Sequence, residues 1–317
     1  MTTKPYVVTL GETMALMASE TPGPLAHAST LSLGIGGSES NVAIGLQRLG
    51  VQAVWCGRIG ADSLGRLVER EIRAEGVDVR VAVDDDAPTG LMIKERRTPT
   101  AQKVAYYRSG SAGSRIAPDD VDDQLIAGAA LLHVSGITPA LSPQAASTFR
   151  YAIAAAKASG VPVSFDLNYR SKLWNAETAG SAYRETIPDV DIVFAGLEEA
   201  ELVVGTVRDA EQAARCIAAM GPSQVVIKLG ADGALAFVDG KVVRQDALVI
   251  EAIDTVGAGD AFVAGYLAEF VEGLRAEERL QTAVSTGAFV CLVPGDWEGL
   301  PRRDELRLLG SHEPVSR

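Results

Sequence analysis

Short apolar stretches rich in β-branched residues alternate with amphipathic segments along most of the chain. The apolar stretches predict strands at residues 7–10, 54–56, 131–134, 163–165, 192–194 and 225–228. Apolar residues at helical spacing predict helices at residues 41–49, 64–75, 144–159, 177–187, 210–220, 258–272 and 278–290. Strands that are apolar on both faces and alternate with helices indicate an α/β fold, whose mostly parallel central sheet is flanked by helices on both faces.

Two stretches depart from this alternation because they hold strands without a helix between them. Residues 31–33 precede a glycine-rich turn, and two strand segments at 89–94 and 103–108 are joined by a polar loop. Segments at about 12–36 and 79–112 are therefore predicted to form a small β-sheet lid beside the core. An edge hairpin of the main sheet is the alternative.

Composition and charge narrow the class of protein. The chain has 317 residues, 47% of them hydrophobic and 22% charged, which is enough apolar material for a sizeable core. No repeat or long linker interrupts it, so residues 1–310 are predicted to form a single domain and residues 311–317 a frayed tail. The formal net charge of −12 disfavours nucleic acid and membrane surfaces as partners, although local amides and arginines can still bind a small anion.

Cysteine and histidine usage excludes two further classes. Cys56, Cys216 and Cys291 have no CxxC spacing, which argues against a disulfide framework and for a reducing compartment. The three histidines are too scattered for a histidine-based zinc site. No secretory signal and no run of 18 uncharged apolar residues is visible, so we expect a cytoplasmic enzyme.

The sequence DTVGAGDAF at residues 254–262 opens a predicted helix. The first amides of a helix have no intrahelical acceptor and carry partial positive charge. Because Gly257, Ala258 and Gly259 have little or no side chain, a phosphate can approach these amides closely. A tight turn followed by Asp260 as a favourable helix-start charge is the alternative interpretation.

An aspartate beside an anion-binding loop suggests chemistry, because the carboxylate would repel the phosphate unless it had a task. Asp260 can act as the general base that takes a proton from an attacking hydroxyl. The adjacent amides would stabilise charge on a transferred phosphoryl group. The pairing predicts phosphoryl transfer to an alcohol. The chain contains neither GxxxxGK[ST] nor GxGxxG, which disfavours a P-loop enzyme and a Rossmann dehydrogenase.

A second glycine group, GIGGSESN at residues 34–41, precedes a predicted helix. It is either a turn capped by Ser40 or Asn41, or a place where hydroxyls of a ligand reach bare backbone.

Three motifs in order, GGSESNVAIGLQRLG at 36–50, GRIGADSLG at 57–65 and DTVGAGDAFVAGYL at 254–267, resemble the signatures of the ribokinase-like (PfkB) carbohydrate kinases. The resemblance extends from residue 7 to about residue 300. It implies a ribokinase-like fold, ATP and Mg²⁺ as cofactors, and transfer of the γ-phosphoryl group to a sugar hydroxyl. It also implies a homodimer or a higher homo-oligomer.

Within this family, YYRSGSAGS at 106–114, HVSGITPALS at 133–142 and DLNYR at 166–170 are similar to kinases of 2-keto-3-deoxygluconate. Arginine suits such a sugar acid, because its planar fork pairs with a carboxylate. Without the resemblance, a surface position would be the favoured interpretation of both Arg108 and Arg170. The resemblance makes Asp260 the base and implies a sugar site formed by Gly37, Asn41, Tyr106, Arg108, Ile137 and Arg170.

The nucleotide is assigned by the same resemblance. IKLGADG at residues 227–233 is similar to the ATP-side loop of the family, with Lys228 as a phosphate contact and Gly230 and Gly233 in the turn. The resemblance also assigns Asn168 to the residues that bind the nucleotide. A strand-to-hairpin turn is the alternative for the loop.

Metal roles rest on single residues. The Asn-x-x-Glu element of the family stands here as Gly196 to Glu199, which leaves Glu199 to act on Mg²⁺ through water. Asp254 is a candidate ligand of a monovalent cation such as K⁺. Met92 takes a lid position where relatives can carry a tyrosine hydroxyl facing the sugar.

Rival functions remain at this stage. One rival is a kinase of the same fold acting on another sugar, such as fructose or 5-dehydro-2-deoxygluconate. A neutral hexose such as fructose needs no arginine pair. A non-catalytic sensor of sugar or nucleotide would keep the fold without turnover, and a redox enzyme using NAD(P) is the weakest alternative.

Overall fold

The buried apolar segments form one nine-stranded sheet in a computed structural model that describes residues 4–98 and 101–310. The strand order is β13-β12-β11-β10-β9-β8-β1-β4-β5. All neighbours from β11 to β5 are parallel, and β12 and β13 pair antiparallel at one edge. The strands are β1 (Tyr6–Leu10), β4 (Gln52–Gly60), β5 (Asp78–Asp84), β8 (Leu131–Ser135), β9 (Val163–Asp166), β10 (Ile192–Gly196), β11 (Gln224–Lys228), β12 (Ala234–Val238) and β13 (Lys241–Gln245).

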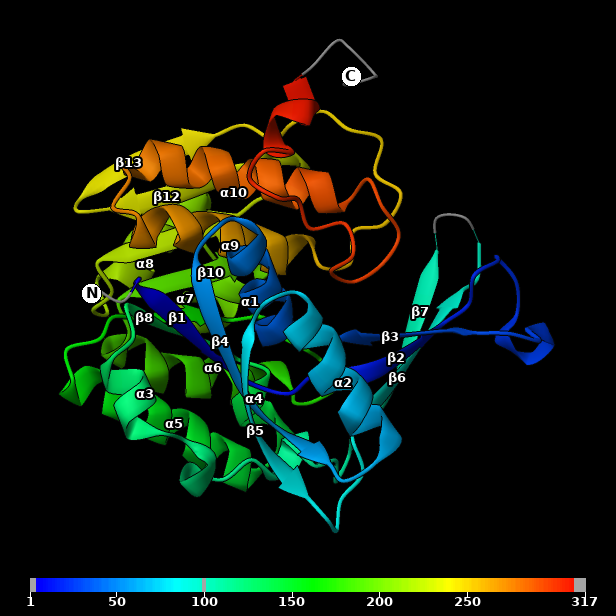
Figure 1. The fold of residues 1–317 in the computed structure, drawn as a ribbon. Coiled ribbons are helices and arrows are strands. Elements are labelled where there is room, and N and C mark those ends of the chain that lie inside the picture. The colour runs from blue at the N-terminus through cyan, green and yellow to red at the C-terminus, as the bar shows by residue number, and fades with distance from the viewer. Residues whose placement is uncertain (1–3, 99–100, 311–317) are drawn as a thin grey trace.

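Helices cover both faces of this sheet because successive strand residues point to opposite sides. Val7 packs into one hydrophobic core and Val8 into the other. The first core contains α1 (Ser38–Arg48), α2 (Ser63–Ala74), α9 (Ala258–Val271) and α10 (Ala276–Val290). The second contains α3 (Asp123–Ala127), α5 (Pro143–Ala158), α6 (Ala176–Thr186), α7 (Leu197–Val204) and α8 (Ala210–Ala218). In Figure 1, α9 and α10 lie toward the top of the view and α3 and α5 toward the bottom. The predicted α/β class with a mostly parallel sheet is confirmed.

A second, four-stranded sheet projects from the side of the core (Figure 1). Its order is β3-β2-β6-β7, built from β3 (Ser32–Gly36), β2 (Met14–Ala18), β6 (Leu91–Arg96) and β7 (Gln102–Tyr107). We call it the lid sheet. The edge-hairpin alternative is wrong, because these strands pair with each other and not with the main sheet.

Two boundaries differ from the sequence prediction. The lid segment expected from residue 79 begins later, because β5 pairs in parallel with β4 in the main sheet. The helix expected at 41–49 begins at Ser38, with Gly37 as its N-cap. Neither Ser40 nor Asn41 caps it: the Ser40 hydroxyl donates to the Gly37 carbonyl, and the Asn41 amide turns toward Asp260. The expected frayed tail at 311–317 lies outside the described residues. Within the described part, no helix is long and apolar enough to cross a bilayer.

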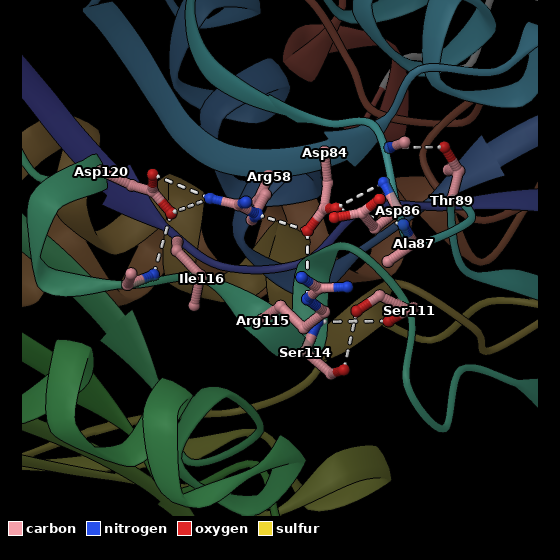
Figure 2. A network of polar contacts seen from close by, with 12 residues as sticks. Arg58, Asp84, Asp86, Ala87, Thr89, Ser111, Ser114, Arg115, Ile116 and Asp120 are labelled. Atoms are coloured by element: carbon pink, nitrogen blue, oxygen red, sulfur yellow. Dashed lines mark hydrogen bonds and ion pairs between the residues drawn. The ribbon is translucent and has the colours of Figure 1, made fainter.

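A network of ion pairs and hydrogen bonds around the buried Asp84 joins the base of the lid sheet to the core (Figure 2). Arg58, at the end of β4, donates from Nε to Asp84 at 2.9 Å and from Nη1 to Asp120 at 3.0 Å. Asp84 also accepts from the amides of Asp86 and Ala87 and pairs with the Arg115 guanidinium. The connections that enter and leave the lid sheet are thereby held to one strand of the core.

Replacing Asp84 tests this anchor. Burial alone would raise the pKa of the Asp84 carboxyl, but the Asp86 amide and the Arg58 guanidinium outweigh it and lower the pKa. A lowered folded-state pKa contributes stability above the unfolded value of about 3.9, and that stability is lost as the pH falls through the folded pKa. We expect Asp84→Asn to reduce the unfolding free energy by about 1–3 kcal/mol at pH 7, because Arg58 keeps only Asp120 as a carboxylate partner and Arg115 loses the carboxylate of Asp84.

Denaturant unfolding across pH measures the effect. The difference from wild type should shrink on acidification, and Asp85→Asn, an exposed neighbour, is the matched control. Equal stability of Asp84→Asn and Asp85→Asn at pH 7 would contradict the anchor.

Candidate active site

A cavity of about 1050 Å³ lies between the lid sheet, the carboxyl ends of the parallel strands and the start of α9. This is the edge at which open α/β sheets bind ligands. Eleven of the residues selected from the sequence line it: Gly37, Asn41, Tyr106, Arg108, Ile137, Asn168, Arg170, Lys228, Gly257, Gly259 and Asp260. The cavity thus collects residues from both glycine motifs, from the lid sheet and from three core strands.

Asp260 sits in the first turn of α9 and is held by the first turn of α1. The Ser38 hydroxyl donates to its Oδ1 at 2.7 Å, and the Asn41 amide donates to its Oδ2 at 2.9 Å. Asn168, which has a left-handed φ of 41°, donates to the Ser38 hydroxyl at 2.7 Å and so extends this series of hydrogen bonds. The carboxylate therefore has a fixed orientation before any ligand arrives.

The environment of Asp260 adjusts its proton affinity. Burial raises the pKa of this carboxyl above its ordinary value, while the hydrogen bonds from Ser38 and Asn41 and the charges of Arg170 and Lys228 lower it. The raising effect of burial prevails. A carboxylate with a raised pKa is a stronger base than an exposed one, which suits proton abstraction near neutral pH.

The loop before α9 brings backbone amides to the same point. Gly257 is the N-cap of α9 and has a φ of 78°, which strains residues with a side chain. A Cβ at Gly257 would also lie 1.9 Å from the carbonyl oxygen of Asp296. A Cβ at Gly259 would meet only the Lys228 ammonium, at 3.8 Å. The bare face of this loop is open toward the cavity and flanked by a cation.

Several of the charged side chains that line the cavity are paired with one another. Lys228 donates to both oxygens of Asp166, at 2.7 and 2.9 Å. Arg108 pairs with the fully buried Glu12 at 2.6 Å. Within residues 4–98 and 101–310, the Arg170 guanidinium has no hydrogen-bond or ion-pair partner. Arg170 is thus free to bind an anion, and Lys172, whose ammonium donates to the Val104 carbonyl oxygen, is a second lining cation with no carboxylate partner among the described residues.

The lid sheet supplies an apolar wall and an aromatic ring. Met14, Leu16 and Met92 pack together and face the cavity. The Tyr106 ring is flanked by Arg108, with CZ at 5.9 Å from its centroid, and by Lys172, with Nζ at 5.4 Å. Cations over an aromatic face hold it electrostatically. The ring is accordingly positioned at the cavity rim.

Five residues selected from the sequence do not line this cavity: Ala258, Glu199, Gly230, Gly233 and Asp254. Glu199 uses one carboxylate oxygen to accept the amide of Tyr169 and the other to accept that of Gly196. Gly230 and Gly233 form the turn between β11 and β12.

Sequence reasoning missed several residues that line the site, among them Ser38 and the charged residues Glu12, Lys94, Asp166 and Asp296. Asp296 lines the cavity, and burial together with the charge of Asp260 raises its pKa to about 7. It lies in a loop after α10 that has no helix or strand pattern, so no local signal marks it. Asp166 and Glu12 each follow a predicted strand, and residues at the carboxyl ends of parallel strands are candidates for ligand binding. Their position in the sequence was therefore a usable signal.

Comparison with known proteins adds to this geometry. The profile described as pfkB family carbohydrate kinase matches residues 4–303. The chain belongs to this family.

Curated relatives of this pfkB kinase cover nearly all of it. It is 37% identical to the 2-dehydro-3-deoxygluconokinase of Thermoproteus tenax, over 93% of the chain and 91% of that protein. The enzyme of the same name from Bacillus subtilis is 36% identical, over 94% and 93%. The 2-dehydro-3-deoxygalactonokinase of Haloferax volcanii is 35% identical, over 92% of both. The similarity is thus shared by kinases named for two related sugar acids.

Solved structures agree with the fold of this pfkB kinase. A 2-dehydro-3-deoxygluconokinase from Thermotoga maritima superposes with a TM-score of 0.88 at 27% identity, covering 97% of this chain and 98% of that one. A putative ribokinase II from E. coli, in complex with ATP and Mg²⁺, gives a TM-score of 0.88 at 22% identity, covering 96% and 98%. The ribokinase-like fold expected from the motifs is confirmed.

The two glycines of the loop before α9 should respond differently to alanine. We expect Gly257→Ala to destabilise the protein by about 2–4 kcal/mol, because it combines a left-handed φ with a backbone clash. Gly259→Ala is the matched control: it meets no atom closer than 3.8 Å and lies in the first turn of a helix, so its stability should equal or exceed that of wild type. Thermal unfolding without ligand measures both, and an equal loss in the two variants would contradict this account of the loop.

Proposed function

We propose that this pfkB kinase transfers the γ-phosphoryl group of ATP to a hydroxyl of 2-dehydro-3-deoxygluconate (2-keto-3-deoxygluconate), with Asp260 as the general base. The observation that carries the proposal is the position of a buried, doubly hydrogen-bonded carboxylate beside the bare amides of residues 257–259. The names of the relatives support the choice of a sugar acid.

The reaction needs one proton transfer and one displacement. Asp260 accepts the proton of the sugar hydroxyl while the hydroxyl oxygen forms a bond to the γ-phosphorus. The bond between that phosphorus and the β–γ bridging oxygen breaks, and ADP leaves. The amides at the start of α9 donate to the phosphoryl oxygens, where the negative charge is spread in the transition state. Ser38 and Asn41 hold the base in line throughout.

The unpaired Arg170 guanidinium supports a substrate that carries a carboxylate. A guanidinium and a carboxylate form charge-assisted, bidentate hydrogen bonds. Arg108 contributes differently, because Glu12 already neutralises it: its guanidinium shapes the wall beside Tyr106. Gly37, Asn41 and Ile137 line the same cavity and complete the sugar site that we propose.

The residues present fit a nucleotide with Mg²⁺ at its phosphates. Lys228 lies beside the α9 amides, so an ammonium and partially positive N–H groups can meet a triphosphate together. No cluster of three metal-ligating side chains occurs among the described residues, which suits Mg²⁺ held mainly by water and nucleotide oxygens. Bound there, Mg²⁺ would offset phosphate charge. Both Glu199 oxygens accept hydrogen bonds from backbone amides, so Glu199 would act on such an ion only through water. We also propose that Asn168, Gly230 and Gly233 contribute to nucleotide binding.

Removal of the base tests the mechanism. We expect Asp260→Asn to lower kcat by about 10²–10⁴, since an amide cannot take the proton. Sugar binding should persist, because the neighbouring polar contacts remain. Steady-state ADP release measures the rate, and stabilisation by the sugar against heat measures binding. Turnover within a few-fold of wild type, in a variant that still binds sugar, would refute the role of Asp260.

A sugar panel tests the substrate. ADP release should be fastest with 2-dehydro-3-deoxygluconate, compared with its galactonate counterpart, 5-dehydro-2-deoxygluconate and fructose. Arg170→Met should raise KM for the sugar acid at least about tenfold, because a hydrogen bond to a charged group contributes about 1.5–3 kcal/mol. Arg150→Met, an exposed arginine on α5, is the control.

The rival functions give different results in the same panel. Faster turnover of fructose, with KM unaffected by Arg170→Met, would replace the sugar acid by a neutral substrate. Thermal stabilisation by sugar or ATP without ADP release would identify a binding module instead of an enzyme.

A further inference from the structure

Lys94 extends from the lid strand β6 into the core and ends between two loops. Its ammonium donates to the Asp254 carboxylate at 2.6 Å and to the carbonyl oxygen of Gly295 at 2.8 Å. The side chains of Lys94 and Asp254 are only 8% and 3% exposed. A charge is buried at such a depth only when it is paired and hydrogen-bonded, so both partners are needed there.

Asp254 connects this ammonium to the loop that precedes α9. Its Oδ1 accepts the amide of Val256 at 3.1 Å, and its Oδ2 accepts the amide of Gly295 at 3.2 Å. The two loops also touch at Gly257, whose missing Cβ leaves room for the Asp296 carbonyl oxygen. The shape of the amide-bearing loop therefore depends on a cation placed between Asp254 and Gly295.

A monovalent metal ion at Asp254, as the sequence suggested, does not fit these residues. Metal cations of this kind are bound by oxygen atoms, and here Asp254 Oδ2 and the Gly295 carbonyl already accept hydrogen bonds from an ammonium. A second positive charge within about 4 Å of Lys94 in a buried site would be strongly repelled. The lysine occupies the position that such an ion would need.

We propose that the Lys94 ammonium is a built-in cation that holds the loop before α9 in its anion-binding shape, and that turnover is consequently independent of K⁺. Lys94 is a positioning residue, because it acts through Asp254 and not on a reacting atom. Since Lys94 belongs to β6, the loop is in its working shape only while the lid sheet lies against the core. The turnover part rests on the proposed kinase reaction; the stability part does not.

Wild-type protein gives the first test and needs no variant. ADP release is measured at one ionic strength with choline, Na⁺ or K⁺ as the cation, and the three rates should agree within about twofold. A tenfold or greater activation by K⁺ would overturn the proposal, because the built-in cation would then be insufficient.

Removal of the ammonium gives the second test. Lys94→Ala should lower kcat at least tenfold in choline, and methylammonium, ethylammonium or K⁺ should restore a substantial part of it, whereas ethanol should not. Lys103→Ala, an exposed lysine on the neighbouring strand β7, is the matched control and should behave as wild type. Wild-type kcat in Lys94→Ala, or a loss that no cation restores in folded protein, would overturn the proposal.

Thermal unfolding without sugar or nucleotide separates this inference from the proposed reaction. Replacing choline with K⁺ in the buffer should raise the Tm of Lys94→Ala by several degrees and leave the Tm of wild type and of Lys103→Ala unchanged. If Lys94→Ala does not fold, Lys94→Arg, which keeps the charge, should fold and be insensitive to K⁺. A Tm of Lys94→Ala that does not respond to K⁺ would count against Lys94 while leaving the kinase reaction untouched.

Discussion

The site depends on one carboxylate kept out of water between the first turns of two helices. Asp260 on α9 receives its hydrogen bonds from Ser38 and Asn41 on α1, and 222 residues separate Asp260 from Ser38. Burial makes the carboxyl a stronger base, and the two donors fix its direction. The packing of α1 against α9 therefore determines both the basicity and the orientation of the Asp260 carboxylate.

Buried ion pairs surround the cavity, and one of them, Lys94 with Asp254, joins the lid sheet to the core. Glu12 with Arg108, Lys94 with Asp254 and Asp166 with Lys228 each satisfy one another around the cavity. Because a buried unpaired charge is costly, such pairs specify how the elements fit. Against this background Arg170, which has no hydrogen-bond or ion-pair partner among the residues described, is available to an anionic ligand.

The sequence correctly predicts several features of the fold and the site. An apolar run predicts each of the parallel strands except β5. The family resemblance identifies eleven residues that line one cavity in the structure. The errors came where pattern was ambiguous. The sequence pattern assigns β5 to the lid because no helix follows it, and it places the start of α1 too late because the first turn of this helix is polar. That turn is polar because it faces Asp260 and the cavity instead of solvent.

By itself the sequence determined the layered fold, the two glycine motifs and the family, because local periodicity and contiguous motifs are properties of neighbouring residues. Only the tertiary structure decided which charges are already paired. Lys94 and Asp254 lie 160 residues apart, and Glu12 and Arg108 lie 96 apart, so no local pattern reveals that each neutralises the other. Electrostatic pairing is a matter of distance in space and of burial, and both are set by the fold.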